Sequence, residues 1–473
     1  MGLIKHAPTF VAGVRCEPEG DANKIISLDG QIEIPSAVTT ASQLREALRY
    51  AESSQEKLHK TSLEERVEVV KLVLKEAAKY REEMSWGLAK FRGLVSKDTH
   101  WMCDLLINWS EQVDELVSAV WGLGAKSTKP IQYKSRFMGN LSFRSKGTAA
   151  LITSSTMDGP PGIAAISHAI LSGTHVIVRP SWKDLTTHFM FEILHANGLD
   201  HYGQMVRWPS SDPQTMSLNR QLIQNVEQGI VFSSDETFAQ LIQGMGDDFA
   251  SHSVLTQKLH KYGTGLPLVI VTGETDLDEA ARLIFLGARR GNGKFCLSHS
   301  PVLVHESIHS SLLEKLSKLS HGIKVGDLLN RETERGQWEP EDLVGLKKLA
   351  QRFGGNVVQG SFGENSMDVL IIDDVPSTSS CLYREYPGTL LALVPFTNLD
   401  EAVSVAQKSL KENRREAWTA VNVFSGEKDY KELICRVDSY HFLRGGITSE
   451  PKFLLPHQGR YFAFDLSRRL TTE

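Results

Sequence analysis

The sequence predicts an α/β protein with two parallel-sheet domains. From Gly147 onward, short and fully apolar segments alternate with helical segments, and the same alternation starts again after Lys261. Apolar strands that alternate with helices are typical of a parallel sheet covered by helices on both faces. The chain has 473 residues, which is too long for a single hydrophobic core and favours two or three domains.

The composition excludes several functional classes. A net charge of -5 argues against nucleic acid or an acidic membrane as a partner. No apolar run reaches the roughly 18 residues that span a bilayer, and we expect no signal peptide at the N-terminus. The five cysteines are scattered and lack CxxC spacing, so we expect a cytoplasmic protein without a disulfide scaffold or a metal site. They are Cys16, Cys103, Cys296, Cys381 and Cys435.

The N-terminal part is predicted to contain short strands followed by helices. The first forty residues form short strands and turns, such as Thr9–Gly13. Ser62 and Glu65 form a capping box, and apolar residues recur at helical spacing over Leu63–Ala77. A further long helix is predicted from about Asp98 to Val120.

A β-hairpin is predicted between the helical region and the first parallel sheet. The segments Ile131–Phe137 and Leu141–Arg144 alternate in polarity around Gly139-Asn140. This pattern predicts a hairpin whose turn lies at the Gly-Asn pair.

The first parallel sheet begins at Gly147. Its predicted elements are the strands Ala149–Ile152, His175–Val178, Gln204–Val206 and Gly229–Phe232 and the helices Pro160–Ser172 and Leu185–Ala196. Parallel sheets bind ligands at the carboxyl ends of their strands. We therefore expect ligand contacts within Thr153–Asp158, Arg179–Lys183 and Ser233–Glu236.

The second parallel sheet begins after Lys261. Its predicted elements are the strands Leu268–Val271, Pro301–Val304, Asn356–Val358, Val369–Ile372, Leu390–Val394 and Ala420–Val423 and the helices Asp276–Arg290 and Leu399–Ser409. The two sheets predict two α/β domains of similar size.

The loop Gly291–Ser298 carries the strongest chemical signal in the chain. It places Cys296 after two glycines that allow a close approach of the backbone to a ligand, and Lys294 lies two residues before the thiol. A nearby cation favours the thiolate, which is the nucleophile in cysteine chemistry. The alternative is a buried cysteine that acts as a small apolar residue.

Five motifs in order resemble the aldehyde dehydrogenase superfamily. Thr9–Gly13 resembles its N-terminal strand, and Ile170–Ser181 resembles "AL-x-x-GN-x-V-x-x-KPS". Leu266–Ala280 is similar to the stretch ending in "DADLDxA", Gly293–Cys296 to "GQxC", and Arg384–Gly388 to "EExFGP". The resemblance covers nearly the whole chain and places Cys296 at the nucleophile.

The resemblance implies three structural parts and an oligomer. Residues 1–122 and 147–258 would form the dinucleotide-binding domain and residues 259–445 the catalytic domain. Residues 123–146 and 446–473 would form an oligomerisation arm, with Arg460–Phe464 as its last strand, in a homodimer or homotetramer.

The resemblance also implies cofactor contacts at Arg179, Ser181, Trp182, Ser234 and Glu385. Arg179 takes the place of a lysine near the adenine ribose, and Glu385 would hold the nicotinamide ribose. Trp182 stands where NAD-preferring members often carry a glutamate. Because no carboxylate there repels a 2′-phosphate, NADP is expected to bind at least as well as NAD. The alternative for Glu385 is an acid of a surface loop.

The chain departs from the family at two catalytic positions. "PWN", whose asparagine helps to hold the oxyanion, is replaced by Ser154-Ser155-Thr156, so that Thr156 would donate the hydrogen bond. "ELGGK", whose glutamate activates the hydrolytic water, is replaced by Lys261–Gly265. The C-terminal "PFGGxKxSG" is nearly absent from residues 450–459. General-base assistance contributes roughly 10²–10⁴-fold, so the loss of the glutamate affects hydrolysis most.

Three functions follow from these departures. The first is NAD(P)-dependent chemistry on an aldehyde or acyl thioester in which coenzyme A or a carrier thiol is the acyl partner. The second is an ordinary hydrolytic aldehyde dehydrogenase with another base. The third is a binding or structural member without turnover. Lys261 and Lys294 would favour an acidic substrate or a phosphate-bearing carrier, or each would pair with a local carboxylate.

Overall fold

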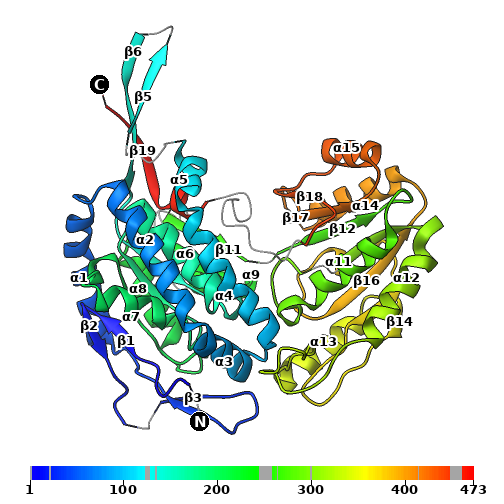
Figure 1. Ribbon diagram of the computed structural model, residues 1–473, viewed down its shortest axis with the longest axis horizontal. Coiled ribbons are helices and arrows are strands. Elements are labelled where there is room, and N and C mark those ends of the chain that lie inside the picture. The colour runs from blue at the N-terminus through cyan, green and yellow to red at the C-terminus, as the bar shows by residue number, and fades with distance from the viewer. Residues whose placement is uncertain are drawn as a thin grey trace. The chain divides into compact units, whose positions relative to one another are not determined.

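The computed structural model describes residues 3–20, 23–122, 128–133, 136–243, 258–263, 265–298, 301–413, 415–447 and 461–472. The chain divides into two compact units (Figure 1). The first comprises Met1–Phe91, His100–Gly263 and Lys452–Glu473, and the second comprises Arg92–Thr99 and Thr264–Pro451. This division says nothing about function. The predicted dinucleotide-binding domain, catalytic domain and oligomerisation arm therefore stay predictions. Within the described ranges, the helices are too short or too polar to cross a membrane.

The first unit is built on a seven-stranded sheet in the order β11-β10-β7-β8-β9-β1-β2. Five strands are parallel, and β1 and β2 extend the sheet antiparallel. The strands are β1 Thr9–Val11, β2 Val14–Cys16, β7 Ala149–Ile152, β8 Val176–Arg179, β9 Gly203–Met205, β10 Gln228–Phe232 and β11 Leu259–Tyr262. A separate antiparallel pair consists of β3 Lys24–Ile26 and β4 Glu33–Pro35.

Helices cover both faces of this sheet, as the fully apolar strands predict. Ala149 and Leu151 pack in one core with α2 and α6, whereas Ala150 and Ile152 pack in another with α1 and α8. The helices that begin within the segments of this unit are α1 Ala41–Leu58, α2 Leu63–Ala77, α3 Arg81–Arg92, α5 Val113–Trp121, α6 Pro160–Ser172, α7 His188–Ala196, α8 Thr215–Gln224, α9 Asp235–Gln243 and α16 Phe462–Asp465.

One helical prediction is wrong. The helix expected from Asp98 to Val120 is two helices, α4 Ser96–Glu111 and α5. The backbone of Gln112, with φ of -97° and ψ of 4°, interrupts the helical geometry between them. The apolar spacing continues across this break, which is why the sequence pattern alone did not reveal it.

The second unit is built on a sheet in the order β14-β15-β16-β13-β12-β17-β18. All neighbours are parallel except the edge strand β14, which is antiparallel to β15. The strands are β12 Pro267–Val271, β13 Pro301–His305, β14 Asn356–Gln359, β15 Leu370–Asp373, β16 Leu390–Phe396, β17 Ala420–Phe424 and β18 Phe442–Arg444. The helices are α11 Leu277–Arg289, α12 Glu306–His321, α13 Pro340–Gln351, α14 Leu399–Glu412 and α15 Glu427–Arg436. The prediction of two parallel sheets is confirmed.

A three-stranded antiparallel sheet in the order β19-β6-β5 belongs to the first unit. Its strands are β5 Thr128–Tyr133, β6 Arg136–Ser145 and β19 Ser467–Thr472. The predicted turn at Gly139-Asn140 is wrong, because both residues pair inside β6. The pairing shifts by one residue beside Gly139, and a glycine inside a strand often marks such a bulge.

The predicted last strand is also misplaced. Phe462–Asp465 is the short helix α16, and the strand follows at Ser467–Thr472. Arg460 and residues 450–459, which the motif comparison included, lie outside the described residues. Phe462 packs against the rings of Phe232 and Tyr262, so its aromatic character serves the core of the unit and not strand pairing.

Candidate active site

Four neighbouring parallel strands of the first unit end at one edge of its sheet. They are β11, β10, β7 and β8, and the predicted residues of this unit lie in the last residues of these strands or follow their carboxyl ends. Those residues are Thr156, Arg179, Ser181, Trp182, Ser234 and Lys261. The structure therefore brings six of the eight predicted residues to one edge, where parallel sheets bind ligands.

Three buried polar atoms at this edge have no hydrogen-bond partner among the described residues. They are Thr153 Oγ1 after β7, Arg179 Nε at the end of β8 and Ser233 Oγ after β10. A buried polar atom without a partner is unfavourable unless a ligand or water satisfies it. This part of the edge therefore offers two hydroxyl groups and one cationic donor to a polar ligand.

Arg179 is more buried than a surface contact to a cofactor would require. Only 6% of the residue is exposed, and its Nη2 lies 3.3 Å from the carbonyl oxygen of Trp208. Burial and, to a smaller extent, the charge of Arg207 lower the pKa of Arg179 to about 10. Nη2 of the guanidinium thus bonds to the protein, while Nε has no hydrogen-bond partner among the described residues.

A carboxylate lies beside Ser181 that the motif comparison did not identify. Ser181 Oγ donates to Asp158, with distances of 2.8 and 3.0 Å to the two carboxylate oxygens. Asp158 is buried. The expected tolerance of NADP rests on Trp182 in place of the family's glutamate, and it stays a prediction. Asp158 adds a carboxylate near this segment, next to Ser181.

Thr156 and Ser234 both make local hydrogen bonds. Thr156 lies in the short 3-10 helix Ser155–Met157, with its hydroxyl 2.9 Å from that of Ser154. The exposed Ser234 accepts the backbone N–H of Thr237 at 3.2 Å, just before α9 begins. Each hydroxyl keeps further hydrogen-bonding capacity.

Lys261 pairs with a local carboxylate. It lies within β11 and forms an ion pair with Asp235 at the start of α9, with its ammonium 5.9 Å from the centre of the Phe238 ring. Of the two alternatives for this lysine, the structure shows the local pairing.

The loop that carries Cys296 is held in an unusual backbone conformation. Gly291, Asn292 and Gly293 all have positive φ, at 59°, 62° and 66°. Asn292 is the one non-glycine among them, and its Nδ2 donates to the carbonyl oxygen of Gln337 at 2.9 Å. Asparagine tolerates the left-handed conformation better than most residues. The side-chain hydrogen bond of Asn292 also holds the loop in this conformation.

Two close approaches fix the backbone on either side of the thiol. A Cβ at Gly293 would lie 2.3 Å from the carbonyl oxygen of Gly388, and a Cβ at Gly265 would lie 1.7 Å from that of Cys296. Both distances are too short for any side chain, so glycine is required at both positions. Gly265 belongs to the segment that matches "ELGGK", and its packing against Cys296 was not foreseen from the sequence.

The environment of Cys296 disfavours the thiolate. Burial and, to a smaller extent, the negative charge of Glu385 raise the pKa of its thiol to about 12. Lys294, which the sequence argument expected to favour the thiolate, donates instead to the carbonyl oxygens of Arg92 at 2.8 Å and Gln337 at 3.4 Å. It also lies 4.3 Å from the centre of the Trp338 ring. The predicted effect of Lys294 on the thiol is therefore wrong.

Glu385 is electrostatically coupled to the thiol. It is half-buried, and its charge also acts on Arg415. It lies three residues before Gly388, whose backbone N–H donates to the carbonyl oxygen of Gly293 at 2.9 Å. Cys296 and Glu385 thus interact electrostatically within the second unit. Glu385 is therefore more than an acid of a surface loop.

The remaining cysteines are not placed for such chemistry. Cys103 and Cys381 are buried, whereas Cys296 is half-buried. Cys16 is half-buried and Cys435 exposed, and all five cysteines are free thiols. The glycine loop and the coupling to Glu385 distinguish Cys296 from these four.

Comparison with protein families gives one match over most of the chain. The model described as "Aldehyde dehydrogenase family" matches residues 25–420. A 1-pyrroline-5-carboxylate dehydrogenase of Bacillus licheniformis is 22% identical over 427 residues, which is 86% of this chain and 79% of that protein.

Other curated relatives match a shorter part. A chloroplastic aminoaldehyde dehydrogenase of Arabidopsis thaliana is 31% identical over 153 residues, 30% of each chain. An aminoacetaldehyde dehydrogenase of Pseudomonas aeruginosa is 26% identical over 36% of each chain. The chain thus matches about a third of the length of these two relatives.

Solved structures share the fold over the whole chain. An NAD-dependent aldehyde dehydrogenase from Sinorhizobium meliloti matches with a TM-score of 0.83 at 19% identity, over 99% of this chain and 95% of that one. A 3,6-anhydro-L-galactose dehydrogenase in complex with NAP matches with a TM-score of 0.79 at 14% identity, over 99% and 100%. At these identities the likeness shows the fold alone.

Proposed function

Because this chain belongs to the aldehyde dehydrogenase family, as its motifs predicted, we propose that it is an NAD(P)-dependent oxidoreductase that acts on the aldehyde or acyl group of a small molecule. The single observation that carries the proposal is the Cys296 loop. Three left-handed residues and two glycine contacts hold this thiol, and Glu385 acts on it electrostatically. Such fixed geometry around one nucleophile is typical of covalent catalysis.

The residues at the strand ends of the first unit fit a dinucleotide. Thr153, Arg179 and Ser233 each present a buried polar atom that the described residues do not satisfy, and Ser181, Trp182 and Ser234 follow the same strand ends. When bound, NAD(P)+ supplies a hydride acceptor for oxidation of an aldehyde. We propose that these residues hold it.

The chemistry of the chain centres on the sulfur of Cys296. The thiol loses its proton, and the thiolate forms a bond to the carbonyl carbon of the substrate. The carbonyl oxygen becomes an oxyanion, to which Thr156 would donate a hydrogen bond. Loss of hydride from the same carbon leaves a thioester on Cys296, and an acceptor then releases the acyl group.

The release step distinguishes the alternatives. Lys261 replaces the family's glutamate and pairs with Asp235, and a protonated lysine cannot take a proton from water. This favours a thiol acceptor such as coenzyme A or a carrier thiol, or the reverse reaction from an acyl thioester. An ordinary hydrolytic enzyme with another base is the second candidate, and a member without turnover is the third.

A pre-steady-state experiment separates the three. The protein is mixed with a series of aldehydes and NAD+ or NADP+, with and without coenzyme A, and the absorbance of the reduced cofactor is followed. We expect a burst of one equivalent and slow turnover that coenzyme A accelerates. Fast linear turnover in water that coenzyme A does not change would favour the hydrolytic enzyme. Absence of reduced cofactor under every condition would favour a member without turnover.

Matched cysteine variants test the nucleophile. Cys296→Ser should abolish the burst, whereas Cys435→Ser, which changes an exposed thiol, should keep it. If folded Cys296→Ser retains a tenth of the wild-type rate, the covalent mechanism is incorrect. Lys261→Glu restores the family's carboxylate and should increase release in water, while Lys261→Met, which only removes the charge, should not.

We further propose a cytoplasmic homodimer or homotetramer. The three-stranded sheet leaves β5 paired only with β6 among the described strands, and such an edge can pair with a strand of another chain. Light scattering should give a mass of two or four times 52.6 kDa. A monomer at micromolar concentration would contradict this assembly.

A further inference from the structure

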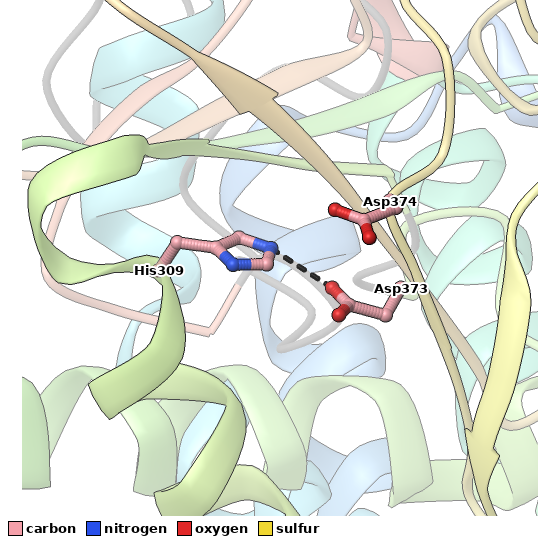
Figure 2. Close-up of side chains that lie close together, drawn as sticks. All are labelled: His309, Asp373 and Asp374. Carbon is pink, nitrogen blue, oxygen red and sulfur yellow. Dashed lines mark ion pairs between the residues drawn. The ribbon is translucent and has the colours of Figure 1, made fainter.

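A second group of chemically active side chains lies in the second unit and has no part in the mechanism above. It consists of His309, Asp373 and Asp374, which we call the His-Asp-Asp cluster (Figure 2). His309 lies in the first turn of α12, Asp373 is the last residue of β15, and Asp374 follows it. No local pattern in the sequence links the three, because His309 lies 64 positions before Asp373.

The backbone brings two consecutive carboxylates to the same place. In a regular strand, successive side chains point to opposite faces of the sheet. Asp374 instead has a positive φ of 50°, which ends the strand and redirects its side chain. As a result, one carboxylate oxygen from each aspartate and one ring nitrogen of His309 all lie within 4.8 Å of one another.

The buried atoms of the cluster are not satisfied by hydrogen bonds. His309 Nε2 and Asp373 Oδ1 lie 2.8 Å apart, but neither atom has a hydrogen bond of acceptable geometry among the described residues. Asp373 is only 9% exposed, so water does not readily replace that bond. Two buried electron-pair donors that face each other without a well-formed hydrogen bond are suited to a shared cation.

The donor set and the spacing agree with a metal ion. Ligands at about 2.0–2.2 Å from one ion lie about 3–3.6 Å from each other, so small side-chain rotations suffice. One imidazole and two carboxylates suit first-row divalent ions such as Zn²⁺, Co²⁺ or Mn²⁺. With neutral His309, the two carboxylates also balance the charge of a divalent ion.

We propose that the His-Asp-Asp cluster binds one divalent transition-metal ion. Asp374 is exposed and provides the entry route, while the buried Asp373 and the half-buried His309 provide the other two ligands. The ion would connect the start of α12 to the end of β15 and so stabilise the second unit. Water would complete its coordination on the exposed side.

Titration of the full chain with Co²⁺ alone tests this proposal. We expect one ion per chain, and the visible spectrum of bound Co²⁺ should show nitrogen and oxygen ligands without a thiolate charge-transfer band. Asp374→Asn and His309→Gln should each weaken binding at least tenfold. His321→Gln, which changes an exposed histidine at the other end of the same helix, should bind as the wild type does.

The same proteins give a second readout by thermal unfolding with Zn²⁺. Zinc should raise the Tm of the wild type and of His321→Gln but not of Asp374→Asn, an exposed position where folding is expected to persist. The proposal is overturned if the wild type binds no Co²⁺ in the millimolar range, or if Asp374→Asn binds it equally. A third outcome also overturns it: His309→Gln lowers the Tm, but zinc does not change the Tm of the wild type. His309 and Asp373 would then stabilise the fold by pairing with each other and not by binding a metal.

Discussion

At the scale of single residues, the structure strongly disfavours deprotonation of the Cys296 thiol. An ordinary thiol has a pKa near about 8.5, whereas burial and the charge of Glu385 raise that of Cys296 to about 12. A raised pKa keeps the thiol neutral at physiological pH. In the proposed mechanism, binding of the substrate or cofactor must therefore change the surroundings of the sulfur.

Alkylation of Cys296 should therefore rise with pH throughout the accessible range. Only the thiolate reacts with iodoacetamide, so the alkylation rate should increase about tenfold per pH unit up to pH 10, where a thiol with a pKa of about 8.5 has already levelled off. Mass spectrometry of the Cys296 peptide measures this rate. Glu385→Gln removes a negative charge that raises the pKa and should accelerate alkylation at pH 8, whereas Glu416→Gln, at an exposed acid, should not. A plateau near pH 8 in the wild type would contradict the raised pKa.

The contact between Gly265 and Cys296 gives a second prediction at this scale. Gly265→Ala places a Cβ where the Cys296 carbonyl oxygen lies, so the loop must move. A displacement of about 1 Å at a reacting group can cost about 100-fold in rate, and we expect a loss of this order in the burst. Gly345→Ala is the control, because no atom lies within 4 Å of its added Cβ. Equal burst rates in both variants would show that the contact does not position the thiol.

At the scale of elements, local signals in the sequence predict helix starts well. Ser62 Oγ accepts the backbone N–H of Glu65 at 3.0 Å, and the Glu65 carboxylate accepts that of Ser62 at 2.6 Å. Both bonds of the predicted capping box are present at the start of α2. The predicted hairpin turn failed because a Gly-Asn pair fits a bulge as well as a turn, and only strand pairing separates the two.

Loss of this cap should destabilise the first unit. Ser62→Ala should lower the free energy of unfolding by about 1 kcal/mol, since one backbone N–H loses its acceptor. Urea unfolding followed by circular dichroism measures the change. Ser62→Asp keeps an acceptor at the same place and should remain close to the wild type. A similar loss in both variants would assign the effect to something other than the cap.

At the scale of the whole molecule, buried histidines make the first unit sensitive to acid. Burial lowers the pKa of His168 and His175 to about 4 and that of His188 to about 3. Above pH 6.5 these residues are neutral in both states and do not affect stability. Below it, the unfolded chain binds protons that the folded chain does not, so stability falls as the pH drops toward 4.

The midpoint of urea unfolding should therefore decrease between pH 7 and pH 5. Each histidine should lower the free energy of unfolding by about 1–3 kcal/mol between pH 7 and pH 5, since one pKa unit corresponds to about 1.4 kcal/mol. His168, which packs edge-on against the Phe462 ring, can be replaced by Leu, and this variant should lose less stability on acidification than the wild type. The control His321→Gln, at an exposed position, should keep the wild-type dependence. An unchanged midpoint in the wild type would contradict the lowered pKa values.

The sequence by itself determined the family, the two parallel sheets and the segments that follow their strands. These features are encoded locally: apolar strands, capping residues and short motifs depend on neighbours a few positions apart. The raised pKa of Cys296, the pairing of Lys261 with Asp235 and the bond from Ser181 to Asp158 were decided only by the tertiary structure. So was the approach of Gly265 to Cys296, 31 positions away. Burial and charge pairing depend on which strand ends and loops the fold places together, and no local pattern contains that information.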